Sequence, residues 1–164
     1  MVKSQYIERN GREEKHKIKA GEDSMKNILF YLVPKNDVMF LYDDYSVRQA
    51  MEKMEFHKYS SVPIISREGK YVGTLTEGDI LWEFKRRGSV NLQEMEEIKI
   101  RTLPRKRDNE PININCNIDD LIMTSMNQNF VPVIDDNQIF IGIITRKSII
   151  GYCYKELKTR KPLE

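Results

Sequence analysis

Two stretches of the chain, GTLTEGDIL at residues 73–81 and GIITRKSII at residues 142–150, have the same order of apolar and polar residues. In each stretch, an apolar run typical of a strand leads directly into the start of a helix. Three pairs of punctuating residues keep one common spacing between the two halves of the chain: Pro63 and Pro132, Gly73 and Gly142, and Thr76 and Thr145. This self-similarity predicts a chain built from two copies of one structural unit.

The first copy predicts the order strand, helix, strand, strand, helix. Its apolar runs are residues 38–42, 61–65 and 70–75, and short runs of this kind are typical of strands. Ser46, followed three positions later by Gln49, is typical of a capping box and predicts a helix between the first two strands. A second helix is expected to follow Thr76 and to end at the basic residues before Gly88.

The second copy repeats this order, with strands expected at residues 111–115, 130–135 and 139–144. Each copy is too small to bury much core alone, so we predict an α+β fold in which two tandem β-α-β-β-α repeats pack about a pseudo-twofold axis. The predicted divisions are a polar, disordered leader (1–24), repeat 1 (25–90), a charged linker (91–106), repeat 2 (107–160) and a tail (161–164).

Composition excludes several classes of protein. A formal net charge of +2 over 164 residues gives no electrostatic reason to expect a membrane or nucleic-acid partner. The chain has no apolar run of about 18 residues and no signal peptide, so we expect a cytoplasmic protein. Cys116 and Cys153 fit no metal or redox spacing, and His16 and His57 are the two histidines. We therefore expect no catalytic residues, no metal site and no required cofactor.

The repeated set of motifs, YSSVPII with GTLTEGDIL and NFVPVID with GIITRKSII, resembles the cystathionine-beta-synthase (CBS) domain pair, also called a Bateman module. The resemblance covers residues from about 27 to 158. It implies a non-enzymatic regulatory module that binds an adenine nucleotide as its regulatory ligand in clefts between the repeats. In that family the acidic residue of the turn holds the ribose hydroxyls, which assigns this role to Asp79, with Thr76 near the ribose or phosphate.

The resemblance also implies that each cleft combines the opening strand and the h-P-h segment of one repeat with the turn of the other. The first site would contain Thr76, Asp79, Ile112, Asn113, Asn129, Phe130 and Val131. The second site would contain Lys35, Val38, Met39, Tyr59, Ser60, Ser61, Thr145, Arg146, Lys147 and Ser148. Tyr59 and Phe130 are either rings that stack on adenine or ordinary core residues.

The two turns differ in charge, because Asp79 of the first is replaced by Ser148 in the second. A carboxylate can accept two adjacent hydroxyls, which favours AMP, ADP or ATP, but Thr76 and Asp79 equally form a capping box that needs no ligand. Arg146 and Lys147 place two cations beside a helix start, which favours phosphate. The second repeat also resembles bacterial CBS pairs that bind cyclic di-AMP, so both a linear and a cyclic nucleotide stay open.

With no catalytic domain fused to it, such a module would act on a separate, unidentified protein target. The resemblance implies a homodimer formed through the helices after the two turns, with Trp82, Phe84, Tyr152 and Tyr154 as interface candidates. One alternative is a ligand-free dimerising scaffold. A less favoured alternative is a nucleic-acid-binding protein, whose basic surface would be Lys85, Arg86 and Arg87 together with residues from Arg101 to Arg107.

Overall fold

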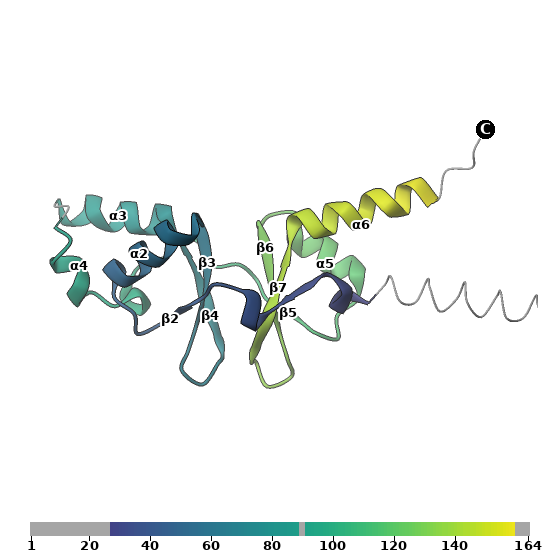
Figure 1. Cartoon of the computed structure of the whole chain (residues 1–164), viewed down its shortest axis with the longest axis horizontal. Helices are drawn as coiled ribbons and strands as arrows, with labels where there is room; N and C mark the ends of the chain where they lie inside the picture. Colours follow the sequence, from purple (N-terminus) through teal and green to yellow (C-terminus); the bar gives the residue numbers. More distant parts are fainter. Residues whose placement is uncertain (1–26, 89–90, 160–164) are drawn as a thin grey trace, which may run out of the picture.

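The computed structural model describes residues 27–88 and 91–159 (Figure 1). The expected leader, residues 1–24, and the expected tail, residues 161–164, lie outside the described residues. The described part is an α+β structure made of two similar halves, which confirms the predicted fold class. Strands occupy the middle of the molecule, and the helices extend outward on either side (Figure 1).

The first half contains the predicted strand and helix order, with additional short segments. Its elements are η1 (Ile28–Tyr31), β1 (Leu32–Pro34), η2 (Lys35–Asp37), β2 (Leu41–Tyr42), α2 (Val47–His57), β3 (Ser61–Ile65), β4 (Tyr71–Thr76) and α3 (Glu77–Arg87). Ser46 and Gln49 form the expected capping box at the start of α2. Helix α3 ends at Gly88, which has a φ of 68°, a left-handed conformation that glycine adopts without a steric penalty.

The second half repeats the same order. A connection containing α4 (Glu94–Glu97) and η3 (Ile100–Thr102) leads to it. Its elements are β5 (Ile112–Asn113), α5 (Ile118–Ser125), β6 (Phe130–Ile134), β7 (Phe140–Thr145) and α6 (Arg146–Thr159). Asn117 caps α5 by accepting a hydrogen bond from the backbone N–H of Asp120, which satisfies one of the unpaired donors at a helix start.

The strands form two sheets, one for each repeat. The first sheet has the order β2-β3-β4, and the second has the order β1-β7-β6-β5. Within each repeat an antiparallel hairpin pairs with one short parallel strand. Strand β1 comes from the start of the chain, yet it pairs antiparallel with β7 of the second repeat. The sequence did not predict this strand, because its pairing depends on a partner more than 100 residues away along the chain.

Each sheet has its own core on the face that its helices cover. The first core is centred on Leu41, Val62, Ile64 and Leu75 with Val47, Ala50 and Met54 of α2. The second is centred on Val131, Val133 and Ile144 with Ile118, Leu121 and Ile149 of the helices. Buried side chains from two layers make each half a packed unit.

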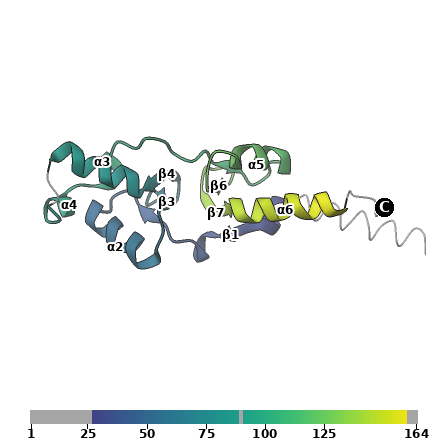
Figure 2. The ribbon, with the colours of Figure 1, turned by 90° about the horizontal axis from the view of Figure 1, so that it is seen from above.

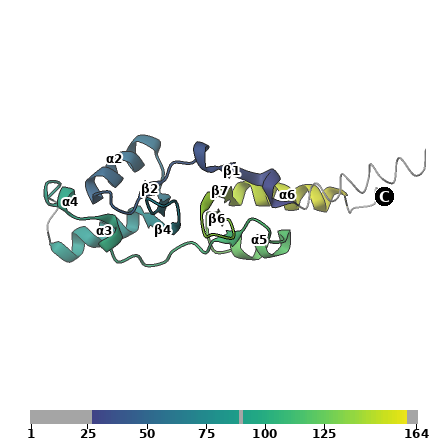
Figure 3. The ribbon, with the colours of Figure 1, turned by 90° about the horizontal axis from the view of Figure 1, so that it is seen from below.

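The two hairpins meet in the middle of the molecule. The Phe140 N–H donates to the Gly69 carbonyl over 2.9 Å, Lys70 and Ile139 form an isolated bridge, and the Tyr71 and Phe140 rings lie 6.2 Å apart. The two chain connections between the halves run along opposite sides of these hairpins (Figures 2 and 3). One is the segment that contains β1, and the other is the linker before β5.

The four residues predicted for the dimer interface differ in their exposure. Trp82 and Tyr154 are 51% and 59% exposed, as an interface would require. Phe84 instead packs against the first core, and Tyr152 is buried in the second core. The interface prediction was therefore wrong for Tyr152, which is 8% exposed. Phe84 is half-buried, and its part in an interface stays a prediction. Within the described ranges, no helix has the length and apolar character that a membrane crossing requires.

Candidate functional site

The first turn is a complete capping box. Thr76 ends β4, and its hydroxyl accepts a hydrogen bond from the Asp79 N–H over 3.1 Å. The Asp79 carboxylate accepts in return from the Thr76 N–H at 3.0 Å and from the Thr76 hydroxyl at 2.7 Å. Asp79 is only 3% exposed. The capping function that the sequence allowed is therefore present in the structure.

The linker also reaches this turn. The Lys106 N–H donates to the second oxygen of the Asp79 carboxylate over 3.1 Å. The carboxylate thus accepts from three donors, and an ionised carboxylate offers about four lone-pair positions. A ribose with two adjacent hydroxyls would meet a carboxylate whose acceptor positions are already largely used.

The second turn lacks the carboxylate. The Thr145 hydroxyl accepts from the Ser148 N–H at 3.2 Å, and the two hydroxyls lie 2.9 Å apart. The Arg146 guanidinium donates through Nε to the Gln128 carbonyl over 2.9 Å, and Lys147 is exposed. The start of α6 therefore carries two cations beside the positive end of a helix dipole, which is a favourable environment for phosphate.

Each turn contacts the h-P-h segment of its own repeat. Ser61 pairs with Thr76, and the Glu77 N–H donates to the Ser60 carbonyl. In the second repeat Phe130 pairs with Thr145. These contacts follow from the hairpins, which bring the start of one strand to the end of the next. Among the described residues, no hydrogen bond joins a turn directly to the h-P-h segment of the other repeat.

The remaining residues predicted for the first site lie in and beside the second sheet. Ile112, Phe130 and Val131 are buried, and Asn129 is exposed. The Asn113 side chain donates to Asp136 over 2.9 Å. Phe130 is 6% exposed, so its ring belongs to the interior of the protein.

The remaining residues predicted for the second site are more dispersed. Val38 and Met39 are half-buried, and Met39 packs against the first core. Tyr59 is exposed and stacks on His57 with the ring centroids 5.9 Å apart. Lys35 lies over the Phe40 ring and near Gly69 at the hairpin tip. Because β1 runs from Thr145 toward this tip, the structure does not bring Lys35 to the second turn.

Four residues that the sequence did not assign to the site connect the linker to both repeats: Arg105, Asp108, Asn109 and Gln128. The Asp108 carboxylate accepts from the Thr74 N–H at 2.8 Å and from Arg105 Nε at 2.8 Å. The sequence feature that could have revealed this contact is Gly73, because a glycine inside a strand often marks a close approach of another segment. A Cβ atom at Gly73 would overlap the Asp108 carboxylate.

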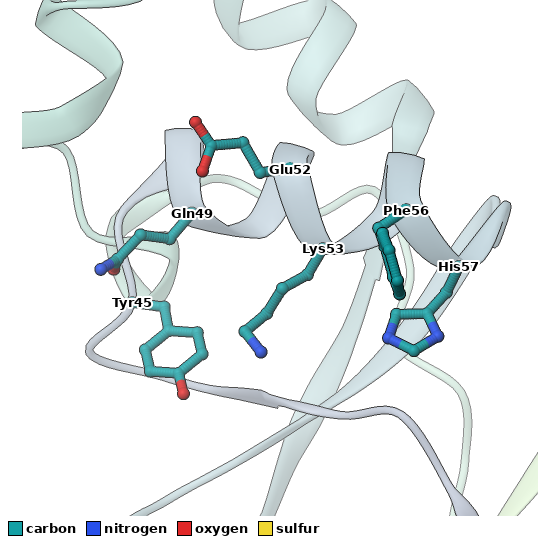
Figure 4. Close-up of a pocket in the computed structure, with 6 residues that line it drawn as sticks. All are labelled: Tyr45, Gln49, Glu52, Lys53, Phe56 and His57. Atoms are coloured by element: carbon teal, nitrogen blue, oxygen red, sulfur yellow. The ribbon is translucent and has the colours of Figure 1, made fainter.

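Two surface pockets are lined by residues of the first repeat. A groove of about 450 Å³ runs along the outer face of α2, where the Lys53 side chain lies between the rings of Tyr45, Phe56 and His57 (Figure 4). It contains none of the predicted site residues. A second pocket, of about 480 Å³, lies between α2 and α3 and is lined by Met51, Met54, Glu55, Lys58, Ser60, Glu77, Ile80, Leu81 and Phe84. It begins beside the first turn, because Ser60 and Glu77 border it.

Burial affects the pKa of neutral acids among the described residues. Burial raises the pKa of the Tyr71 hydroxyl above its ordinary value and also raises that of the Cys116 thiol. Both groups therefore stay protonated at neutral pH. In the part of the chain that the structure describes, no three His, Cys, Asp or Glu side chains gather where they could bind a metal ion.

Three of the seven basic residues considered for nucleic-acid binding form ion pairs. Arg86 and Arg87 both form ion pairs with Glu83, and Arg105 pairs with Asp108. Lys85 lies over the Trp82 ring with its ammonium 5.1 Å from the centroid. These carboxylates offset the positive charge of the three arginines, so the basic surface is weaker than the sequence alone suggests.

Comparisons with known proteins agree with the repeated architecture. The family described as CBS domain matches residues 30–86 and 100–155. A crystal structure of CbpB in complex with c-di-AMP is 31% identical, with a TM-score of 0.71, over 82% of this chain and 89% of that chain. CbpB from Streptococcus agalactiae is 30% identical, with a TM-score of 0.68, over 82% of this chain and 85% of that chain.

A curated relative, named L-aspartate semialdehyde sulfurtransferase, comes from Methanocaldococcus jannaschii. It is 25% identical over 146 residues, which is 89% of this chain and 26% of the relative. The chain therefore spans about a quarter of the length of this relative, and the name of that larger protein does not assign an activity to the shared part.

Proposed function

Because the chain belongs to the CBS domain family, we propose that it is a non-enzymatic regulatory module that binds an adenine nucleotide between its two repeats. The ligand is AMP, ADP, ATP or cyclic di-AMP. The observation that carries the proposal is the pair of strand-to-helix turns, at Thr76 and Thr145, in a chain 31% identical to a CbpB whose crystal structure contains c-di-AMP.

The second turn supports a ligand with more than one phosphate. Arg146 and Lys147 stand at the start of α6, and the Thr145 and Ser148 hydroxyls are adjacent to them. Guanidinium and hydroxyl groups beside a helix start form charge-assisted hydrogen bonds to phosphate oxygens. This arrangement favours cyclic di-AMP at the second turn.

The first turn supports a mononucleotide. Asp79 is a buried carboxylate at a helix start, and a carboxylate in that position can accept from a ribose diol. Two residues predicted for the second site, Ser60 and Ser61, also lie against this turn. We propose that AMP, ADP or ATP binds here, with Thr76 close to the ribose or phosphate.

The assignment is tested by titrating two variants with AMP, ATP and cyclic di-AMP in an isothermal calorimeter. Asp79→Ala is expected to remove mononucleotide binding. Arg146→Ala is expected to lower the affinity for cyclic di-AMP by about tenfold or more. Asp120→Ala is the matched control for the first variant, because Asp120 has the same position at the start of α5. Arg101→Ala, an exposed arginine, is the control for the second. Equal affinities in all four variants would contradict the assignment.

We further propose that the bound nucleotide changes the affinity of the module for a separate protein target. Thermodynamic linkage then requires the target to change the nucleotide affinity by the same factor. This reciprocity separates the proposal from a ligand-free dimerising scaffold, because a scaffold would bind its target with the same affinity with and without nucleotide.

A further inference from the structure

We propose that residues 105–110, here called the strap, couple the two turns, and that Gln128 is the residue through which the strap positions Arg146. The inference rests on the proposed function, since it concerns how one nucleotide site influences the other. The strap contacts Asp79 of the first turn at one end. At its other end it contacts Gln128, whose carbonyl accepts Arg146 of the second turn.

The strap is fixed to the first repeat by two carboxylates. Asp79 accepts from the Lys106 N–H at 3.1 Å. Asp108 accepts from the Thr74 N–H at 2.8 Å and is held in place by Arg105, whose Nε lies 2.8 Å from the same oxygen. Hydrogen bonds that involve an ionised group are stronger than neutral ones, so Asp79 and Asp108 determine where the strap lies.

Asn109 joins the strap to both repeats at once. Its carbonyl accepts from the Tyr71 hydroxyl over 2.9 Å, and its side-chain amide donates to the Phe130 carbonyl over 2.9 Å. The Tyr71 ring in turn stacks on Phe140 of the second sheet. A displacement of the strap on the first repeat is therefore transmitted to β6, the strand that begins at Phe130.

Two hydrogen bonds between Gln128 and Glu110 transmit this displacement to Gln128. Its side-chain oxygen accepts from the Glu110 N–H at 3.0 Å, and its side-chain nitrogen donates to the Glu110 carbonyl at 2.9 Å. Gln128 is 6% exposed, so moving Glu110 alone would leave a buried amide without partners, which is costly. Gln128 must therefore follow Glu110, and with it the carbonyl that holds Arg146 Nε.

The Asp79 carboxylate is the point where a nucleotide can act on the strap. It accepts from Thr76 twice and from Lys106 once, and a ribose diol needs two further acceptor positions where about one remains. The Thr76 donors are three residues away in the same capping box, whereas Lys106 belongs to a distant segment. A bound ribose is therefore expected to replace the Lys106 N–H and release the strap.

Amide hydrogen exchange of the full chain without nucleotide tests the coupling independently of ligand identity. In Asp79→Asn the side chain keeps one acceptor oxygen, which cannot serve both Thr76 and Lys106. We expect exchange of the Lys106 and Glu110 amides, and of the Arg146 amide that donates to the Asn129 carbonyl, to rise about fivefold to tenfold. Asp120→Asn, at the equivalent position of α5, should leave these amides unchanged. Faster exchange at Lys106 without any change at Glu110 and Arg146 would overturn the coupling.

A double-mutant cycle with cyclic di-AMP as the probe tests the role of Gln128. Gln128→Ala is expected to weaken binding by about fivefold or more, and to have no further effect in an Arg146→Ala background. This non-additivity is the signature of a residue that acts through another, and a merely structural role would not produce it. Gln93→Ala, an exposed glutamine, is the control.

The two experiments separate failure of this inference from failure of the proposed function. Equal losses caused by Gln128→Ala in both backgrounds would overturn the positioning role. If the wild-type protein binds none of cyclic di-AMP, AMP, ADP and ATP, the proposed function fails, while the exchange of Glu110 and Arg146 in Asp79→Asn still decides whether the strap couples the turns.

Discussion

At Gly73 the missing side chain is what allows the strap to reach the first repeat. The equivalent residue of the second repeat, Gly142, admits a different segment, because a Cβ atom there would overlap the Val33 carbonyl of β1. Each repeat therefore has a glycine at the same position, and at each of these glycines one of the two chain connections between the halves packs closely against the strand. A glycine at these places is a steric requirement of the close approach.

Gly73→Ala is predicted to destabilise the protein by about 1–3 kcal/mol, because the added methyl group displaces Asp108. Gly151→Ala is the matched comparison, since a Cβ atom at Gly151 meets nothing within 4 Å. It lies inside α6 and should stabilise the protein by about 0.5–1 kcal/mol, the difference in helix propensity. Urea unfolding measures both. A Gly73→Ala variant as stable as the wild type would contradict the contact.

Glu83 is a buried carboxylate that accepts from Arg86 and Arg87. Burial acts to raise its pKa, but the hydrogen bonds and charges of Arg87 and Arg86 outweigh burial and hold the pKa below its ordinary value of 4.5. A carboxyl whose pKa is lowered by folding stabilises the folded state above its ordinary pKa. That stabilisation disappears as the pH falls through the folded pKa.

Glu83→Gln is therefore predicted to be less stable than the wild type at pH 7, with a difference that shrinks as the pH falls from about 5 to 3. The free energy of unfolding, measured across this range, checks the prediction. Glu94→Gln, which changes an exposed glutamate of α4, is the control variant. A difference that stays constant with pH would mean that the ionised Glu83 does not stabilise the fold.

Among the elements, β1 departs most from the predicted pair of β-α-β-β-α repeats, because it crosses from the first repeat to the edge of the second sheet. Gly142→Ala is predicted to prevent this pairing, since the Cβ atom would overlap Val33. Exchange of the Leu32 and Val33 amides should become faster, and the protein should be destabilised by about 1–3 kcal/mol. In Gly78→Ala a Cβ atom would meet only the Thr76 hydroxyl at an ordinary 3.5 Å, so β1 should stay protected. Unchanged protection of β1 in Gly142→Ala would contradict the register.

The elements themselves were largely predictable from local sequence. The capping box at Ser46, the helix end at Gly88 and the strands β3 and β4 depend on neighbouring residues. Strand β1 and the strap were not predicted, because their contacts are made with residues distant in the sequence. The two turns were predicted, because each is a local motif. The contacts of Asp79 with Lys106 and of Arg146 with Gln128 were not predicted, because they join different segments.

At the scale of the whole molecule, apolar side chains lie exposed on the helices after both turns. Leu81 and Trp82 of α3 and Ile150, Tyr154 and Leu157 of α6 are between 51% and 65% exposed. Patches of this kind often mark protein interfaces. They agree with the expectation, which came from the family resemblance, that two copies of the chain pair through these helices.

We propose that two copies of the chain form a dimer through α3 and α6. Trp82→Glu and Tyr154→Glu are predicted to convert this proposed dimer to a monomer, because each would bury an unpaired charge at the interface. Sedimentation equilibrium of the wild type and of each variant measures this. Phe30→Glu, which changes an aromatic residue that is 66% exposed on η1, should leave the dimer intact. A monomeric wild type at all concentrations would contradict pairing through α3 and α6.

Binding of an adenine nucleotide is the property on which the proposed function of this CBS pair depends. The most direct test is calorimetric titration of the wild-type protein with cyclic di-AMP, AMP and ATP in turn, with GTP as the control. We expect saturable binding of at least one adenine nucleotide and no binding of GTP. If none of the three adenine nucleotides binds, the proposed function is wrong, and the dimerising scaffold becomes the function to test.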